Sequence, residues 1–304
     1  MLLPSRLDLK GSMQHRFIVV LVISGVFFFA TGALGADSGA LIETYDAGWI
    51  NWTRGVVMAQ GVGAPVQKKT DDAQTRKTAV QAAHQNGWQN LFAAAKRVRI
   101  TATSTVADLA AKDDAIRFKL EEMTRAAEII KQEYLSDGTV AVTLQLSLYG
   151  GFAQMLLPFD IEQIETIKAG TADNQVTSGH ALPKGPASQT SDIYTGLVVD
   201  TRGLAVRPVL APIIVDENGQ EVYGPGIVSR EFAVQHGVSG YTRDLETAQK
   251  AKRVLNTPLT VKALRISGQA RAPIVIGNTA AAKLRSSFEN LNFLKECRVV
   301  IVIE

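Results

Sequence analysis

The segment RGVVMAQGVG, residues 54–63, and the alanine-rich stretch that follows it decide the fold of the first half of the chain. The segment is short and apolar and ends in glycines, which predicts a β-strand. Residues 72–96 are expected to form a helix, because small and apolar residues recur there at spacings of three and four. These residues are Val80, Ala83, Gly87, Leu91, Ala94 and Val98. Most of this face is alanine or glycine, so we expect the helix to lie very close to a sheet.

A strand and a second helix are predicted after it. Residues 98–106 alternate and are rich in β-branched side chains, which is typical of a strand. Asp113 and Asp114 begin the next helix, because carboxylates are favoured at the positive N-terminal end of a helix. The buried stripe of this helix comprises Ile116, Leu120, Met123 and Ala127.

The last two strands of this first domain form a hairpin. Residues 128–135 and 139–148 flank Ser136-Asp137-Gly138, in which Asp-Gly is a strong turn signal. Residues 140–148 alternate between apolar and polar side chains, as in a strand with one wet face. We therefore expect residues 46–158 to form a small α+β domain, with a sheet on one side and helices on the other.

A linker and a second α+β domain are predicted for the rest of the chain. Residues 168–192 are mostly Gly, Ser, Thr, Pro, Asn and Gln, a composition typical of linkers, and we place the linker at residues 159–192. The second domain covers residues 193–304. Strands are expected at residues 194–201, 209–215, 220–223, 259–266, 273–276 and 298–303, the last apolar throughout and covered on both faces.

The second domain has two predicted helices and one predicted hairpin. Residues 216–219, DENG, form the hairpin turn between two of the strands. Thr242 caps a helix that extends to about residue 254. Asn278 caps another, with one face made of Ala281, Leu284, Phe288 and Leu291.

The first 36 residues have the pattern of a secretory signal peptide. His15-Arg16 precedes an uncharged apolar stretch, residues 17–36, that ends in small residues. Met1 and Met13 are both acceptable starts, and Ala33 and Gly35 precede a cleavage position before Ala36. The alternative is an uncleaved membrane anchor, because about 20 apolar residues span a bilayer. Export is the prediction.

Composition and charge exclude several classes of protein. The chain has 304 residues, 46% hydrophobic and 20% charged, which argues against a mainly disordered polymer. The net charge is +3, and because the first 36 residues hold three basic side chains against Asp8, the remainder carries +1. A near-neutral chain predicts no nucleic-acid partner. A single cysteine, Cys297, excludes an internal disulfide framework.

The order of motifs in the first domain resembles the lipoprotein-20 family of bacterial envelope proteins. The motifs that carry the resemblance are Arg54-Gly55, the helix with Arg76, Ala79, Ala82-Ala83 and Asn90-Leu91, residues 98–108, the stripe around Met123, and Asp137-Gly138-Thr139-Val140. The family is similar to the N-terminal domain of the flagellar protein FlgT and includes the flagellar protein FlgP. The resemblance implies an α+β fold and a non-enzymatic structural role, in some members in rings around the flagellar motor.

One departure from that family concerns the membrane. Lipoprotein members have a cysteine just after the signal peptide, and this sequence has none there. We therefore expect no lipid anchor, and a periplasmic protein that is soluble or held at the outer membrane by partners. The second domain looks like a module that accompanies the first in related envelope proteins.

No residue pattern predicts catalysis, and we expect no catalytic, cofactor-binding or metal-binding residues. His84, His180 and His236 each lack a second ligand three or four positions away. Cys297 is expected to be a buried, unreactive thiol. Asp71-Asp72 and Asp113-Asp114 are interpreted as helix-dipole partners. Trp49, Trp52 and Trp88 are expected in core or rim positions, and a cluster at the domain entrance is the alternative. Lys68-Lys69 and Arg76-Lys77 are expected to form a solvated helix face.

Three function classes remain. The first is an exported structural or assembly protein of the cell envelope, with envelope or flagellar proteins as partners, and with homo-oligomers formed through strands 54–61 or 298–303 if these lie at sheet edges. The second is a ligand- or peptidoglycan-binding module that uses a surface made of Tyr194, Tyr223 and Tyr241. The third, an enzyme, would need an active site assembled from residues that are distant in sequence.

Overall fold

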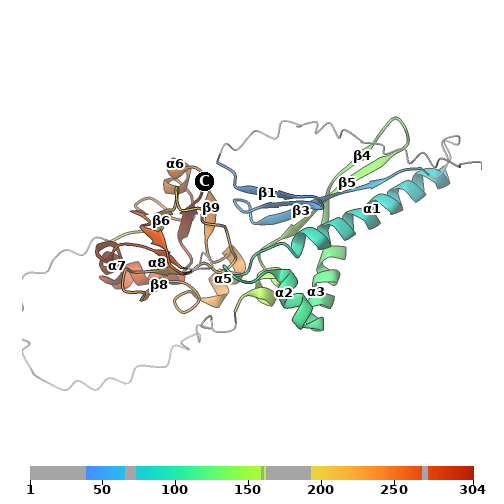
Figure 1. Ribbon diagram of the computed structural model, residues 1–304. Coiled ribbons are helices and arrows are strands. Elements are labelled where there is room, and N and C mark those ends of the chain that lie inside the picture. Colours follow the sequence, from blue (N-terminus) through green and yellow to red (C-terminus); the bar gives the residue numbers. More distant parts are fainter. Residues whose placement is uncertain (1–38, 66–72, 159–160, 162–192, 269–272) are drawn as a thin grey trace, which may run out of the picture. The chain divides into compact units, whose positions relative to one another are not determined.

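The computed structural model describes residues 39–65, 73–158, 161, 193–268 and 273–304 (Figure 1). These residues belong to one compact unit, Asp37–Glu304. Helices and three sheets are both present, so the predicted α+β class is confirmed. The predicted leader and almost all of the predicted linker, as well as Lys68-Lys69, Asp71-Asp72 and His180, lie outside the described residues. None of the described helices has the length and apolar composition that a membrane span requires.

The first part of the unit is an antiparallel five-stranded sheet with one long helix against it (Figure 1). The strand order is β1 (Ile42–Tyr45), β2 (Gly48–Asn51), β3 (Val56–Gly63), β5 (Val140–Ser147) and β4 (Glu128–Tyr134). Helix α1 (Ala73–Ala95) packs on β3 and β5, and α3 (Asp114–Arg125) packs on α1 and α2 (Val106–Lys112). The predicted hairpin is confirmed, with Gly138 at φ +83° in its turn.

Glycines allow α1 to approach β3 at backbone distance, as the small-residue face predicted. A Cβ atom at Gly61 would lie 2.1 Å from the carbonyl oxygen of Ala83, and one at Gly63 would lie 2.0 Å from that of Ala79. On the helix, Gly87 faces Gly61, and Asn90 Nδ2 donates to the carbonyl oxygen of Gln60. The helix therefore rests on the strand itself rather than on a layer of side chains.

The predicted strand at residues 98–106 is wrong. Arg99 and Thr105 form a single β-bridge across a tight turn, in which the Ile100 N–H donates to the Ser104 carbonyl and the Thr101 and Ser104 hydroxyls lie 2.7 Å apart. Thr105 then caps α2 in a capping box with Asp108. Hydroxyl side chains that bond locally to the backbone replaced the strand ladder.

The second part of the unit contains two four-stranded sheets. The parallel sheet has the order β10 (Leu259–Lys262), β6 (Leu197–Asp200), β13 (Val299–Val302) and β9 (Gly240–Thr242). The mixed sheet has the order β11 (Arg265–Ile266), β12 (Ile274–Val275), β7 (Ile214–Val215) and β8 (Glu221–Tyr223). The helices of the second part are α5 (Arg230–His236), α6 (Leu245–Gln249), α7 (Asn278–Arg285) and α8 (Phe288–Lys295). Helix α4 (Gly151–Leu156) ends the first part and contacts α3 and α5.

Several predicted elements of this part need correction. Thr242 belongs to β9 and its hydroxyl donates to the carbonyl oxygen of Gly39, while Asp244 caps the short α6. The predicted helix after residue 278 is two helices, because Ser287 caps a new one, and Phe288 is exposed rather than on the buried face. Strand 259–266 divides between two sheets. Helix α5, which includes His236, was missed.

We expect Gly61→Ala to lower the free energy of unfolding by about 1–3 kcal/mol, because its methyl group forces α1 away from β3. Urea denaturation followed by circular dichroism measures this change. Gly151→Ala is the control, since its Cβ would meet only Met123 Cε at 3.5 Å and its φ is not positive. Equal midpoints for the two variants would show that the close approach carries no constraint.

Candidate functional site

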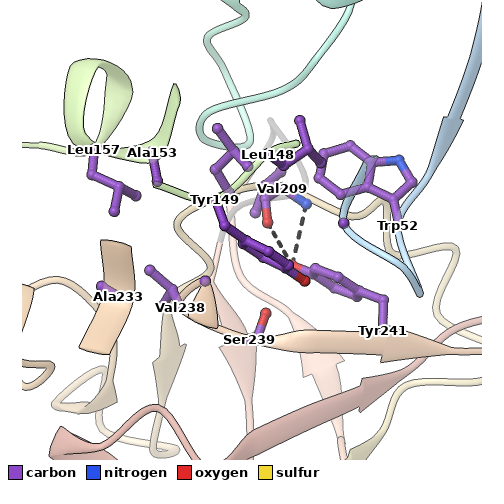
Figure 2. A pocket seen from close by; sticks show the side chains of 13 residues that line it. Trp52, Leu148, Tyr149, Ala153, Leu157, Val209, Ala233, Val238, Ser239 and Tyr241 are labelled. Carbon is purple, nitrogen blue, oxygen red and sulfur yellow. Dashed lines mark hydrogen bonds between the residues drawn. The ribbon is translucent and has the colours of Figure 1, made fainter. Parts of the chain in front are cut away.

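An aromatic cluster joins the first and second parts of the described unit (Figure 2). Trp52 and Tyr241 meet edge to face at 5.9 Å, and the Tyr241 hydroxyl donates to the carbonyl oxygen of Val209 at 2.8 Å and accepts from its N–H at 3.2 Å. The Tyr149 ring lies where a side chain at Gly55 or Gly237 would stand. The hollow among these residues is about 20 Å³, room for one water molecule, so this cluster is a structural junction.

Three hydrogen bonds between backbone groups and one from a side chain to the backbone continue the junction. The Leu210 and Ala211 N–H groups donate to the carbonyl oxygens of Arg99 and Ile100, both at 2.9 Å. The Gly150 N–H donates to the Val234 carbonyl at 2.8 Å, and the Arg230 guanidinium donates to the Pro158 carbonyl at 2.8 Å. Residues about a hundred positions apart are thereby held together.

The predicted tyrosine surface for sugar stacking is wrong. Tyr223 is fully buried and its hydroxyl donates to the carbonyl oxygen of Val238, and Tyr241 lies in the junction. Burial raises the pKa of Tyr241 to about 12 and that of Tyr223 well above its usual value. Only Tyr194 is partly exposed. Two of the three rings are therefore core residues that no sugar can reach.

Cys297 is a buried thiol, as predicted. It follows α8 in the left-handed region at φ +58°, where its N–H donates to Leu294 and the Arg298 N–H donates to Phe293, a Schellman motif. Burial raises the pKa of the thiol from 9.0 to about 11. A thiol with so little thiolate is a poor nucleophile.

Two buried carboxylates are committed to ion pairs in the second part. Asp200, at the end of β6, accepts two hydrogen bonds from the Arg202 guanidinium at 2.9 Å and lies 3.3 Å from Lys262 Nζ. The hydrogen bond from Arg202 lowers the pKa of Asp200 to about 2. Arg285 pairs with Asp216 at 2.8 Å and lowers its pKa. These pairs hold strand ends and loops in place.

The other residues singled out in the sequence are dispersed. Asp113 caps α3 by accepting from the N–H groups of Ala115 and Ile116, as its helix-start role predicted. His84 lies on α1 beside Gln132 and Trp88, and His236 is exposed at the end of α5. Trp52 is buried in the junction and Trp88 is half-buried on α1, which fits the core or rim positions expected for them. Within the described ranges, His, Cys, Asp and Glu side chains nowhere gather in threes as a metal site requires.

Two adjoining hollows are large enough for a ligand, and neither was predicted. The apolar groove, about 310 Å³, is lined by Val206, Pro212, Ile213, Pro273, Ile274 and Ile301 among others. The basic pocket, about 470 Å³, is lined by four cationic residues together with Tyr45 and Thr105. The cationic residues are Lys96, Arg97, Arg99 and Arg207. Because Arg207 is about a hundred positions from the other three in sequence, only the junction that brings residues 96–105 to residues 206–213 could have revealed the pocket.

The sheet edges also differ from the expected ones. Strand 54–61 corresponds to β3, which lies between β2 and β5, and strand 298–303 to β13, which lies between β6 and β9, so neither is an edge. The edges of the first sheet are β1 and β4. All seven residues of β4 are exposed, Tyr134 by 60%.

Residues 196–304 match a family model described as the second domain of Treponema pallidum Tp0624. The second part of the unit is thus similar to that domain. No curated protein matches the chain. The resemblance of residues 46–158 to the lipoprotein-20 family stays a prediction, as do the domain boundaries.

We expect the Cys297 thiol to react with iodoacetamide at least a hundredfold more slowly in the folded protein than in urea, at about pH 8, because burial limits both access and ionisation. Mass spectrometry of the alkylated chain measures the rates. A cysteine introduced at exposed Ser136 is the control. Equal rates at the two positions in the folded protein would contradict the buried, unionised state.

We expect Asp200→Asn to lower the free energy of unfolding by about 1 kcal/mol near neutral pH, since a pKa unit corresponds to about 1.4 kcal/mol and Arg202 is partly screened by water. A lowered carboxyl pKa stabilises the fold above its unfolded value of 3.8, and this stabilisation is lost as pH falls toward about 2. The gap between wild type and variant should therefore close between about pH 4 and pH 2, measured by urea denaturation. Glu122→Gln, on exposed α3, is the control, and a gap independent of pH would contradict the ion pair.

Proposed function

We propose that this chain is an exported, non-enzymatic structural or assembly protein of the bacterial cell envelope, located in the periplasm or at the outer membrane. The resemblance of its first domain to the lipoprotein-20 family supports this role and makes the flagellar basal body one setting for it. The observation that carries the proposal is the exposed edge strand β4, because unpaired strand edges accept strands from other molecules.

The residues of β4 fit a second copy of the same strand. Lys131 Nζ and Glu133 Oε1 lie 2.8 Å apart on the exposed strand. In an antiparallel pair with Gln132 opposite Gln132, Lys131 of each copy lies opposite Glu133 of the other. Ile129, Ile130 and Leu135 are at least 40% exposed and supply apolar surface to the same contact. Opposite charges across a strand pair are favourable, and like charges are not.

We expect the purified protein to form dimers or larger assemblies. Lys131→Glu should raise their dissociation constant at least tenfold, because the variant places Glu opposite Glu133. The double variant Lys131→Glu with Glu133→Lys should restore the assembly, since it exchanges the charges and keeps them complementary. Size-exclusion chromatography with light scattering measures the mass. Lys119→Glu, on exposed α3, is the control.

In-cell crosslinking followed by mass spectrometry tests the envelope setting. The expected result is a β4 crosslink to a second copy or to an envelope protein. A strict monomer without any envelope neighbour, or residence in the cytosol, would overturn the proposal.

A second candidate function is a periplasmic ligand-binding module. The apolar groove and the basic pocket favour it, because ligand sites are commonly concave and a few hundred Å³ in volume. A tyrosine surface for peptidoglycan is not part of this candidate, because Tyr223 and Tyr241 are buried.

A further inference from the structure

We propose that the basic pocket and the apolar groove together bind a single-chain anionic lipid, with its carboxylate or phosphate head in the pocket and its acyl chain in the groove. The inference deepens the ligand-binding candidate by naming its ligand class, and it is independent of strand addition at β4.

The basic pocket has positive charge that the protein leaves uncompensated. Arg99 is neutralised, because its guanidinium lies 2.6 Å from the Glu43 carboxylate and donates to the Pro208 carbonyl at 3.0 Å. Lys96, Arg97 and Arg207 have no carboxylate within ion-pair distance among the described residues. None of the residues that line the pocket is acidic. Three cations around one hollow favour an anion there.

Aromatic rings hold two of these cations in place. Arg97 lies over the Tyr45 ring at 6.0 Å, and Lys96 Nζ lies over the Phe92 ring at 5.2 Å. Cation–π contacts position a charge without neutralising it. Both side chains are therefore oriented and remain available to a ligand.

The apolar groove suits a hydrocarbon chain. The buried Ile274 and Ile301 come from β12 and β13, and Pro212 and Pro273 also line the groove. Its charged lining residue is Arg207. A volume of about 310 Å³ is at the lower end of small-molecule sites, which suits one chain better than two.

Arg207 connects the two hollows, since it lines both. The turn after α1 does the same: Thr101, Ala102 and Thr103 line the groove, and Arg99 and Thr105 line the pocket. A ligand whose charge meets Arg207 can therefore place its chain in the groove directly behind it. The required chemistry is an anionic group attached to one apolar chain.

The test uses the full chain and isothermal titration with dodecyl phosphate and dodecanoate below their micelle concentrations. Both should bind, at least tenfold more tightly than butyl phosphate, which lacks the chain, and dodecyl maltoside, which lacks the charge. Affinity should fall as salt is added, because the head pocket is open to solvent. Inorganic phosphate serves as the probe for the head alone.

Different variants test the contacts of the ligand's head group and the contacts of its acyl chain. Arg207→Glu and Arg97→Glu should each lower the affinity for dodecyl phosphate at least tenfold, whereas Lys119→Glu should leave that affinity unchanged. Ala102→Phe, on an exposed turn, should block the groove. The variant should therefore lower the affinity for dodecyl phosphate and leave the affinity for butyl phosphate unchanged. Thermal unfolding checks that each variant is folded.

Three results would overturn the inference. They are equal affinity for dodecyl and butyl phosphate, equal affinity for dodecyl phosphate and dodecyl maltoside, and equal effects of Arg207→Glu and Lys119→Glu. None of them changes the mass of the assembly, so a failure here is distinguishable from a failure of the strand-addition proposal.

Discussion

The contact of α1 with β3 at backbone distance is the constraint on which the rest of the structure depends. Gly61 and Gly63 remove the side chains that would separate helix from strand, and Ala79 and Ala83 do the same on the helix. A helix placed so closely has a fixed height above the sheet, and its last turn therefore has a fixed position. Lys96 follows that turn directly, and the chain then leads into the residues that meet the second part of the unit.

The junction converts this local constraint into a ligand-sized site. Two backbone hydrogen bonds tie residues 99–100 to residues 210–211, and the ring of Tyr149 occupies the space that Gly55 and Gly237 leave free. Rigid contacts of this kind fix the distance between side chains that are about a hundred positions apart in the sequence. The basic pocket therefore depends on the junction, because the junction brings Arg207 to the residues that follow α1. The junction depends in turn on the packing of α1, which sets where those residues lie.

The sequence predicted what depends on local pattern and missed what depends on distant pairing. The small-residue helix face, the Asp-Gly hairpin and the apolar strand at residues 298–303 are set by neighbouring residues, and all three were found. The strand prediction for residues 98–106 was wrong because hydroxyl groups there form hydrogen bonds with the nearby backbone. The sheet edges, the burial of Tyr223 and the cluster around Arg207 depend on contacts between residues in different elements of the chain, for which a single sequence carries no periodic signal.

The order of strands in the parallel sheet has a consequence for how the chain is made. Strand β13 follows all its partners in sequence yet lies at the centre, between β6 and β9. Val198 pairs with Val300, so a nascent polypeptide cannot close this sheet until residues 299–302 have been synthesised. Long-range parallel pairing is slow to form. Until β13 is available, β6 and β9 have no strand between them to which they can both pair.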